Sequence, residues 1–391
     1  MATAHLAVQP LSASRQREYG LDWLRVIAFV ILIFFHGGQF LVWVDWSVKT
    51  LEISPSLLWN CLTGVMTFVH SWRLPLLFFI AGAGVSFSLR RRTGGQFVLE
   101  RLRRLLIPLA FGMFVICPPQ TYIYRVQAGW HYASYWEFWG TIFNMVRYPE
   151  GNLSWWHLWF LPYILTYSLL VLILHAWLRA PAGPAFSDGL ARLCERPGVI
   201  YLVAIPNILA AVILGPYWPV TLNLTSDWAN FTGSLLTFLW GFVMCGSPRF
   251  LDLIERRRRE FLFVAVGMTV LFFAIRLPHS LDGANPYQRI WIFALVDCNF
   301  NMAIIFTLVG WSRALINRDS PALRYANTAV YPFYILHQTI LASLSYAWFG
   351  WHARLAVKFP ALLAGTLVSS WLIYEAVRRN RVSRLLFGMK P

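Results

Sequence analysis

Two residues that could do chemistry, Arg25 and His36, lie inside the first long apolar run of the 391-residue chain. They are eleven positions apart, which on an α-helix places them about 20° apart around the axis and about 16 Å apart along it. They therefore share one helix face. An ionisable side chain at membrane depth is costly unless it meets a partner or water, so it often marks a functional site. The simpler alternative is that Arg25 reaches the headgroups and that His36 is a satisfied core histidine.

The second apolar run contains His70 and Arg73, which are one helical turn apart and share a face near its middle. Pro75 disturbs the helix backbone there, and Gly82 and Gly84 let a neighbouring helix or a thin ligand approach closely. A kinked helix with a buried arginine predicts a cavity. The alternative is that the proline and glycines serve only helix packing and that Arg73 pairs with a buried acid.

A basic segment follows, and in it Arg101 and Arg104 are three positions apart and neighbours on one helix face. Guanidinium groups match the geometry of phosphate oxygens, and Arg90 lies in the same segment. Arginines at the inner ends of membrane helices are also a common result of topology, so the pair by itself is a weak signal.

The segment 127–161 is rich in aromatic residues with a few acids, among them Glu137, His157 and Trp159. Aromatic faces with carboxylates are typical of sugar binding, although an interfacial aromatic belt has the same composition. Two more ionisable residues, Asp297 and His337, lie inside later apolar runs and are functional candidates for that reason. Asp297 could orient a histidine or balance a buried arginine.

The elements that must position these residues are membrane helices. The composition is 58% hydrophobic and 13% charged, against about 25% charged residues in soluble proteins. We therefore expect an all-α polytopic membrane protein with one domain, about ten transmembrane helices and no cleavable signal peptide. The ten runs are 21–44, 57–88, 105–126, 157–178, 199–215, 229–246, 261–277, 289–311, 327–347 and 355–377.

The net charge of +16 is distributed by loop. If the N-terminus is cytoplasmic, 24 of the 33 Lys and Arg residues fall in inner segments. This bias follows the positive-inside rule, so we expect both termini in the cytoplasm and no nucleic-acid partner. The five cysteines are scattered and the nine histidines show no ligand spacing, so we expect neither a disulfide framework nor a metal site.

Several motifs occur in an order that resembles the membrane acyltransferase-3 family. Within that family the chain resembles the branch of glucan biosynthesis protein C, which succinylates osmoregulated periplasmic glucans. The resemblance covers nearly the whole chain, although Ala81-Gly82 stands where the family usually has Ser-Gly. The matching stretches are 17–22, Arg25 with His36 (the family's arginine–ten residues–histidine signature), 70–73 with 78–82, Arg101 with Arg104, 157–161, 331–337, and 374–375 with 386–391.

The resemblance implies a multi-pass protein of the bacterial inner membrane that moves an acyl group from cytoplasmic acyl-coenzyme A to a hydroxyl of a periplasmic glucan. All steps are expected within the membrane domain, without a metal. The pantetheine arm is expected to enter between the first two helices and to bring the thioester toward His36. The expected catalytic residues are His36, Arg25 and Asp297; the coenzyme A ligands are Arg101, Arg104, Arg25 and Arg90; the substrate ligands are His70, Arg73, His157, Trp159, Glu137 and His337.

In this hypothesis His36 removes the proton from the acceptor hydroxyl as a general base, since imidazole titrates near neutral pH. A transient acyl-histidine is an alternative to direct attack.

Two other functions stay open. One is an O-acetyltransferase for another surface polysaccharide. The other is a proton-coupled transporter, because intramembrane His, Arg and Asp residues also form proton relays. Binding of coenzyme A separates the enzyme from the transporter.

Overall fold

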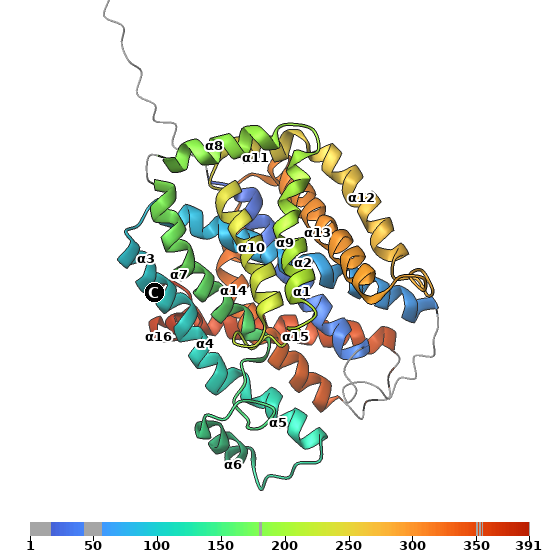
Figure 1. Ribbon diagram of the computed structural model, residues 1–391. Coiled ribbons are helices and arrows are strands. Elements are labelled where there is room, and N and C mark those ends of the chain that lie inside the picture. The colour runs from blue at the N-terminus through green and yellow to red at the C-terminus, as the bar shows by residue number, and fades with distance from the viewer. Residues whose placement is uncertain are drawn as a thin grey trace, which may run out of the picture.

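The computed structural model describes residues 17–42, 57–179, 182–348, 351, 353 and 355–390, and their regular structure is helical (Figure 1). The prediction of an all-α chain is confirmed for these residues. The helices are α1 Tyr19–Val42, α2 Leu57–Leu89, α3 Gly94–Arg101, η1 Leu102–Leu106, α4 Ile107–Phe111, η2 Gly112–Ile116, α5 Pro118–Gln127, α6 Tyr135–Gly140, η3 Thr141–Asn144, η4 Trp156–Trp159, α7 Phe160–Arg179, α8 Ala182–Cys194, η5 Val199–Ala204, α9 Ile205–Leu214, α10 Trp228–Met244, α11 Pro248–Arg256, α12 Arg258–Ala274, α13 Pro286–Ile316, α14 Pro321–Ala347, α15 Leu355–Val377 and α16 Arg381–Leu386.

Each of the ten predicted ranges overlaps a helical segment. Within the described ranges six segments are long and apolar enough to cross a membrane, or seven if α10 and α11, bent by 100° at their junction, form one broken span. Several apolar helices of this length are typical of a multi-pass membrane protein. The count of ten spans and the cytoplasmic position of both termini stay predictions, and the predicted end of the first span at 43–44 lies outside the described residues.

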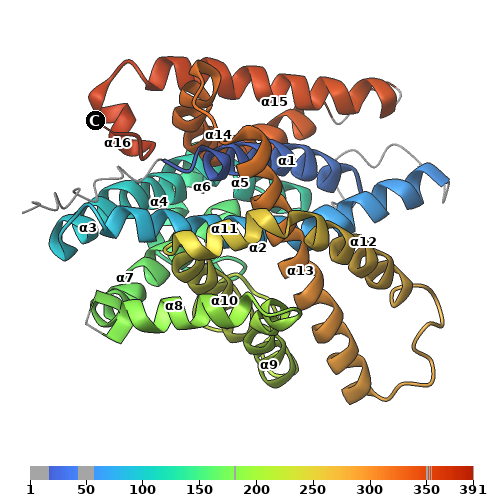
Figure 2. The ribbon, with the colours of Figure 1, turned by 90° about the horizontal axis from the view of Figure 1, so that it is seen from above.

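Helix α1, which carries Arg25 and His36, lies inside the bundle and packs against α2, α13, α14 and α15 (Figure 2). In the same view α3, α8 and α16 lie toward the C-terminus of the chain, on the side opposite to the C-terminal end of α1. The neighbours of α1 come from both halves of the sequence. Any site on its inward faces is therefore assembled from distant segments.

The close packing of α2 against α10 explains one of the two glycines singled out in the sequence. A Cβ atom at Gly82 would stand 1.9 Å from the carbonyl oxygen of Phe238, and one at Gly241 would stand 1.9 Å from that of Phe79. Only glycine allows the two backbones to approach this closely. A Cβ atom at Gly84 would meet nothing within 4 Å, so the two positions have different roles.

A proline sets the local geometry where Arg104 lies, in the π-helical turn η1. Pro108 has no N–H, so the carbonyl group of Arg104 lacks its usual helical donor four residues later. The hydroxyl of Tyr331 on α14 donates to that oxygen at 2.8 Å instead. This bond ties the segment of the predicted phosphate ligands to α14.

Candidate functional site

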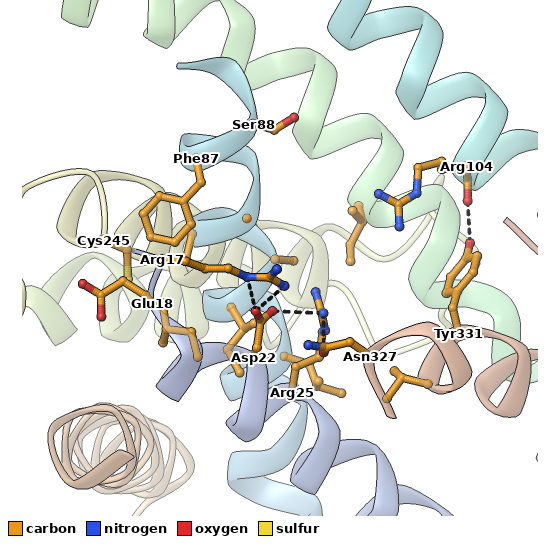
Figure 3. A pocket seen from close by; sticks show the side chains of 18 of the residues that line it. Arg17, Glu18, Asp22, Arg25, Phe87, Ser88, Arg104, Cys245, Asn327 and Tyr331 are labelled. Atoms are coloured by element: carbon orange, nitrogen blue, oxygen red, sulfur yellow. Dashed lines mark hydrogen bonds and ion pairs between the residues drawn. The ribbon is translucent and has the colours of Figure 1, made fainter. Parts of the chain in front are cut away.

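One cavity of about 1100 Å³ opens among α1, α2, the α3–η1 segment and α14 (Figure 3). Its lining contains nine basic and three acidic side chains. A surplus of arginine in a concave site favours a ligand with several negative charges, such as phosphates. The basic residues are Arg17, Arg25, Arg90, Arg91, Arg92, Arg101, Arg104, Arg313 and Lys390, and the acidic residues are Glu18, Asp22 and Glu100.

Arg25 is held in place from both sides of the cavity. Its guanidinium donates to Asp22 on α1 at 3.1 Å and to the side-chain oxygen of Asn327 on α14 at 2.7 Å (Figure 3). Asp22 also pairs with Arg17 at 2.7 Å. These bonds orient Arg25 within the lining of the cavity.

The other three predicted phosphate ligands line the same cavity. Arg104 pairs with Glu100 at 3.3 Å, whereas Arg101 lies 3.8 Å from the same carboxylate and stacks 4.8 Å over the ring of Phe97. Arg90 donates to the backbone oxygen of Gly246. The structure thus brings Arg25, Arg90, Arg101 and Arg104 to one concave surface.

Two residues that line the cavity, Glu18 and Arg313, belong to an ion-pair cluster at the start of α1. Arg313, at the end of α13, lies 3.3 Å from Glu18 and also pairs with Asp252 and Glu255. Burial raises the pKa of the Glu18 carboxyl above its ordinary value, although the nearby Arg313 opposes the rise. The cluster connects α1 to α11 and α13.

Phe29 and Tyr334, whose rings are 5.5 Å apart, are two of the residues that line the cavity. His36 is not among the described residues that line it. The sequence predicted a path from the inner arginines to His36 between the first two helices. The structure adds residues of α14 to the walls of this cavity, and the onward path to His36 stays a prediction.

Beyond these aromatic residues three histidines lie in a row. The rings of His36 and His337 have centroids 5.2 Å apart, and the rings of His337 and His157 are also 5.2 Å apart. Nδ1 of His36 lies 2.8 Å from the side-chain oxygen of Gln39. The structure therefore brings together His36 and two of the predicted substrate ligands.

The side chains of His157 and Trp159 are buried and contact other helices of the bundle. Nε2 of His157 lies 3.0 Å from the carbonyl oxygen of Ile335, and Nδ1 lies 3.3 Å from the amide nitrogen of Gln120. Both ring nitrogens are used in holding α5 and α14 together. Trp159 is buried in the hydrophobic core beside Phe78. The structure thus gives both side chains a role in packing, and their assignment as substrate ligands stays a prediction.

Arg73 is the most unusual charged group of the site. It is 2% exposed, and neither its Nε nor its Nη1 atom has a hydrogen-bond partner among the described residues. The guanidinium lies 4.0 Å over the ring of Phe35. The ring of His70 stacks on the same phenylalanine, with the two ring centroids 5.4 Å apart. A buried cation without a carboxylate is costly, so this position favours an incoming anion.

Two predicted residues lie elsewhere. Both carboxylate oxygens of Asp297, on α13, accept from Arg276 in the turn after α12, at 2.8 Å each. The charge of Asp297 is therefore balanced by Arg276 and not by a histidine, Arg25 or Arg73. Glu137 accepts from the backbone N–H of Ala133 and closes the turn that leads into α6. Because these carboxylates have structural partners, we do not propose a catalytic or substrate-binding role for them.

With this geometry in view, a comparison with known families decides the class of the protein. A family model described as an acyltransferase domain matches residues 18–375. The chain belongs to the acyltransferase-3 family. No curated protein and no solved structure gives a significant match to this acyltransferase. The matched range contains the residues that line the arginine-lined cavity except Arg17 and Lys390, together with the histidine row and Arg73.

Three residues of this acyltransferase's site were missed by the sequence analysis: Asn327, Tyr331 and Tyr334, all on α14. Together with His337 they are spaced by four, three and three positions, which places them along one helix face. This polar stripe in an apolar run was the available signal. Its pairing with Arg25 and Arg104 depends on helix packing and could not be read from the chain.

Proposed function

We propose that this acyltransferase moves a succinyl group from cytoplasmic succinyl-coenzyme A to a hydroxyl of a periplasmic glucan in the bacterial inner membrane. The observation that carries the proposal is the arginine-lined cavity, whose lining residue Tyr334 is one helical turn before His337 of the histidine row. A donor held by its phosphates in this cavity has its other end directed toward two imidazoles and a buried guanidinium.

The proposal that the acyl donor is a coenzyme A thioester rests on charge and size. Coenzyme A carries a diphosphate and a further phosphate on one end of a long, thin arm, and the cavity has six more basic than acidic lining residues (nine minus three). Arg101 and Arg104 bind the phosphates in this proposal, with Arg90 and Arg25 beside them. Bidentate contacts from guanidinium groups to phosphate oxygens are among the stronger hydrogen bonds in proteins.

The choice of a succinyl group rests on Arg73. Two nitrogens of its buried guanidinium, Nε and Nη1, have no hydrogen-bond partner among the described residues, and the group lies in the same part of the molecule as His36. The free carboxylate of a succinyl group supplies the missing anion, whereas an acetyl group leaves the cation uncompensated. His70, which stacks on the same Phe35 ring, completes the walls of this acyl pocket in the proposal.

The chemical step follows from the position of His36. His36 removes the proton of the acceptor hydroxyl as the oxygen attacks the thioester carbonyl carbon, and the C–S bond breaks as the C–O bond forms. Phe29 and Tyr334 must part for the thioester to reach His36, a side-chain movement typical of gated active sites.

Purified protein in lipid nanodiscs tests this proposal with succinyl- or acetyl-coenzyme A and a glucan acceptor, read by mass spectrometry of the glucan. We expect succinylated glucan from the wild type and a loss of about 10²- to 10⁴-fold in rate for His36→Asn. His175→Asn on α7 is the matched control, because His175 packs against Phe242 and does not line the cavity. Equal rates for His36→Asn and the wild type contradict the catalytic role, and exclusive transfer of acetyl contradicts the succinyl assignment.

A further inference from the structure

The hydrogen bonds of His337 fix where its lone pair lies. Nδ1 of His337 is 2.8 Å from the carbonyl oxygen of Tyr334 and 3.2 Å from that of Phe333. Carbonyl oxygens only accept hydrogen bonds, so Nδ1 carries the proton of the neutral ring. The lone pair is then on Nε2. This atom is buried and has no hydrogen-bond partner among the described residues.

His36 has the same arrangement, and His157 has the opposite one. Nδ1 of His36 faces the side-chain oxygen of Gln39, which leaves the lone pair of His36 on Nε2. His157 donates from Nε2 to the carbonyl of Ile335, and its Nδ1 is occupied by Gln120. Of the three histidines in the row, His36 and His337 each keep a ring nitrogen that can accept a proton.

The position of His337 connects the two ends of the site. Its ring lies 6.1 Å from the ring of Tyr334, one of the residues of the arginine-lined cavity, and 5.2 Å from the ring of His36. The charged and titratable groups that face it are His36 from α1, Arg73 from α2 and His157 from η4. His337 is therefore next to both the expected thioester and the expected base.

We propose that His337 is a second proton carrier, which takes the proton from His36 and delivers it to the departing thiolate of coenzyme A. The acceptor hydroxyl loses its proton to Nε2 of His36, and the C–O bond forms while the C–S bond breaks. The proton then passes to Nε2 of His337 and on to the sulfur. Both rings return to their neutral form, and the products are the ester and free coenzyme A. This inference rests on the acyl transfer proposed above.

His337→Asn is the discriminating variant, because the asparagine amide retains a donor for the carbonyl groups of α14 and lacks the basic nitrogen. We expect kcat to fall about 10²- to 10⁴-fold, with KM for succinyl-coenzyme A unchanged within about twofold. His175→Asn should keep wild-type rates. His337→Gln is an independent second variant, because its amide also lacks a basic nitrogen; we expect the same fall in kcat with KM unchanged within about twofold.

Three outcomes overturn the relay. One is a His337→Asn rate within about threefold of the wild type while His36→Asn is inactive. Another is a His337→Gln rate within about threefold of the wild type, which decides the question even if His337→Asn does not fold. The third is a wild type that transfers no acyl group. That result removes the proposed function itself, and with it the relay, and is distinguished from the first two by the absence of any product.

Discussion

Replacing Arg101 by glutamine tests the arginine-lined cavity most directly. The Arg101 side chain is 14% exposed, and the nearest carboxylate, that of Glu100, is 3.8 Å away. Its guanidinium is therefore shielded from water but only weakly paired, which leaves it available to a phosphate. A hydrogen bond to a charged group contributes about 1.5–3 kcal/mol, so loss of one such contact predicts a coenzyme A dissociation constant raised about 10- to 150-fold.

The same helical turn provides a matched control. Arg103 is two positions away, is exposed and does not line the cavity. We expect Arg103→Gln to bind coenzyme A as the wild type does, and both variants to melt at similar temperatures. Isothermal titration of coenzyme A into protein in nanodiscs measures the difference. A dissociation constant for Arg101→Gln within about twofold of the wild type, or an equal loss in Arg103→Gln, refutes the reasoning that assigns phosphate binding to the cavity.

Three further predictions concern packing and buried polarity. Gly82→Ala should destabilise the fold by about 1–3 kcal/mol because its Cβ meets the α10 backbone, whereas Gly84→Ala should melt like the wild type; equal melting temperatures would count against the close helix contact. Tyr331→Phe leaves the Arg104 carbonyl without its donor and should cost about 1–3 kcal/mol in unfolding free energy, measured by denaturation in detergent. Arg73→Met removes a buried, uncompensated cation, so its melting temperature should not fall, while the ratio of succinyl to acetyl transfer should drop at least about tenfold; an unchanged ratio contradicts the acyl pocket.

The sequence by itself determined the class of the protein, because the cost of burying charge and unpaired backbone groups in lipid restricts the chain to apolar helices. The same cost makes each ionisable residue inside a span conspicuous, so Arg25, His36, Arg73 and His337 could be selected one by one. The paired arginines Arg101 and Arg104 could be selected only as a weak signal, since topology produces the same pattern.

Only the tertiary structure decided which of these groups meet. The sequence left Asp297 available to a histidine, but the turn after α12 supplies Arg276. The sequence could not show that Gln120 and the α14 backbone contact both ring nitrogens of His157. Helical spacing fixes the face on which a side chain lies but not the helix that packs against that face. Partner, burial and tautomer therefore follow from the packing of helices that are distant in the sequence.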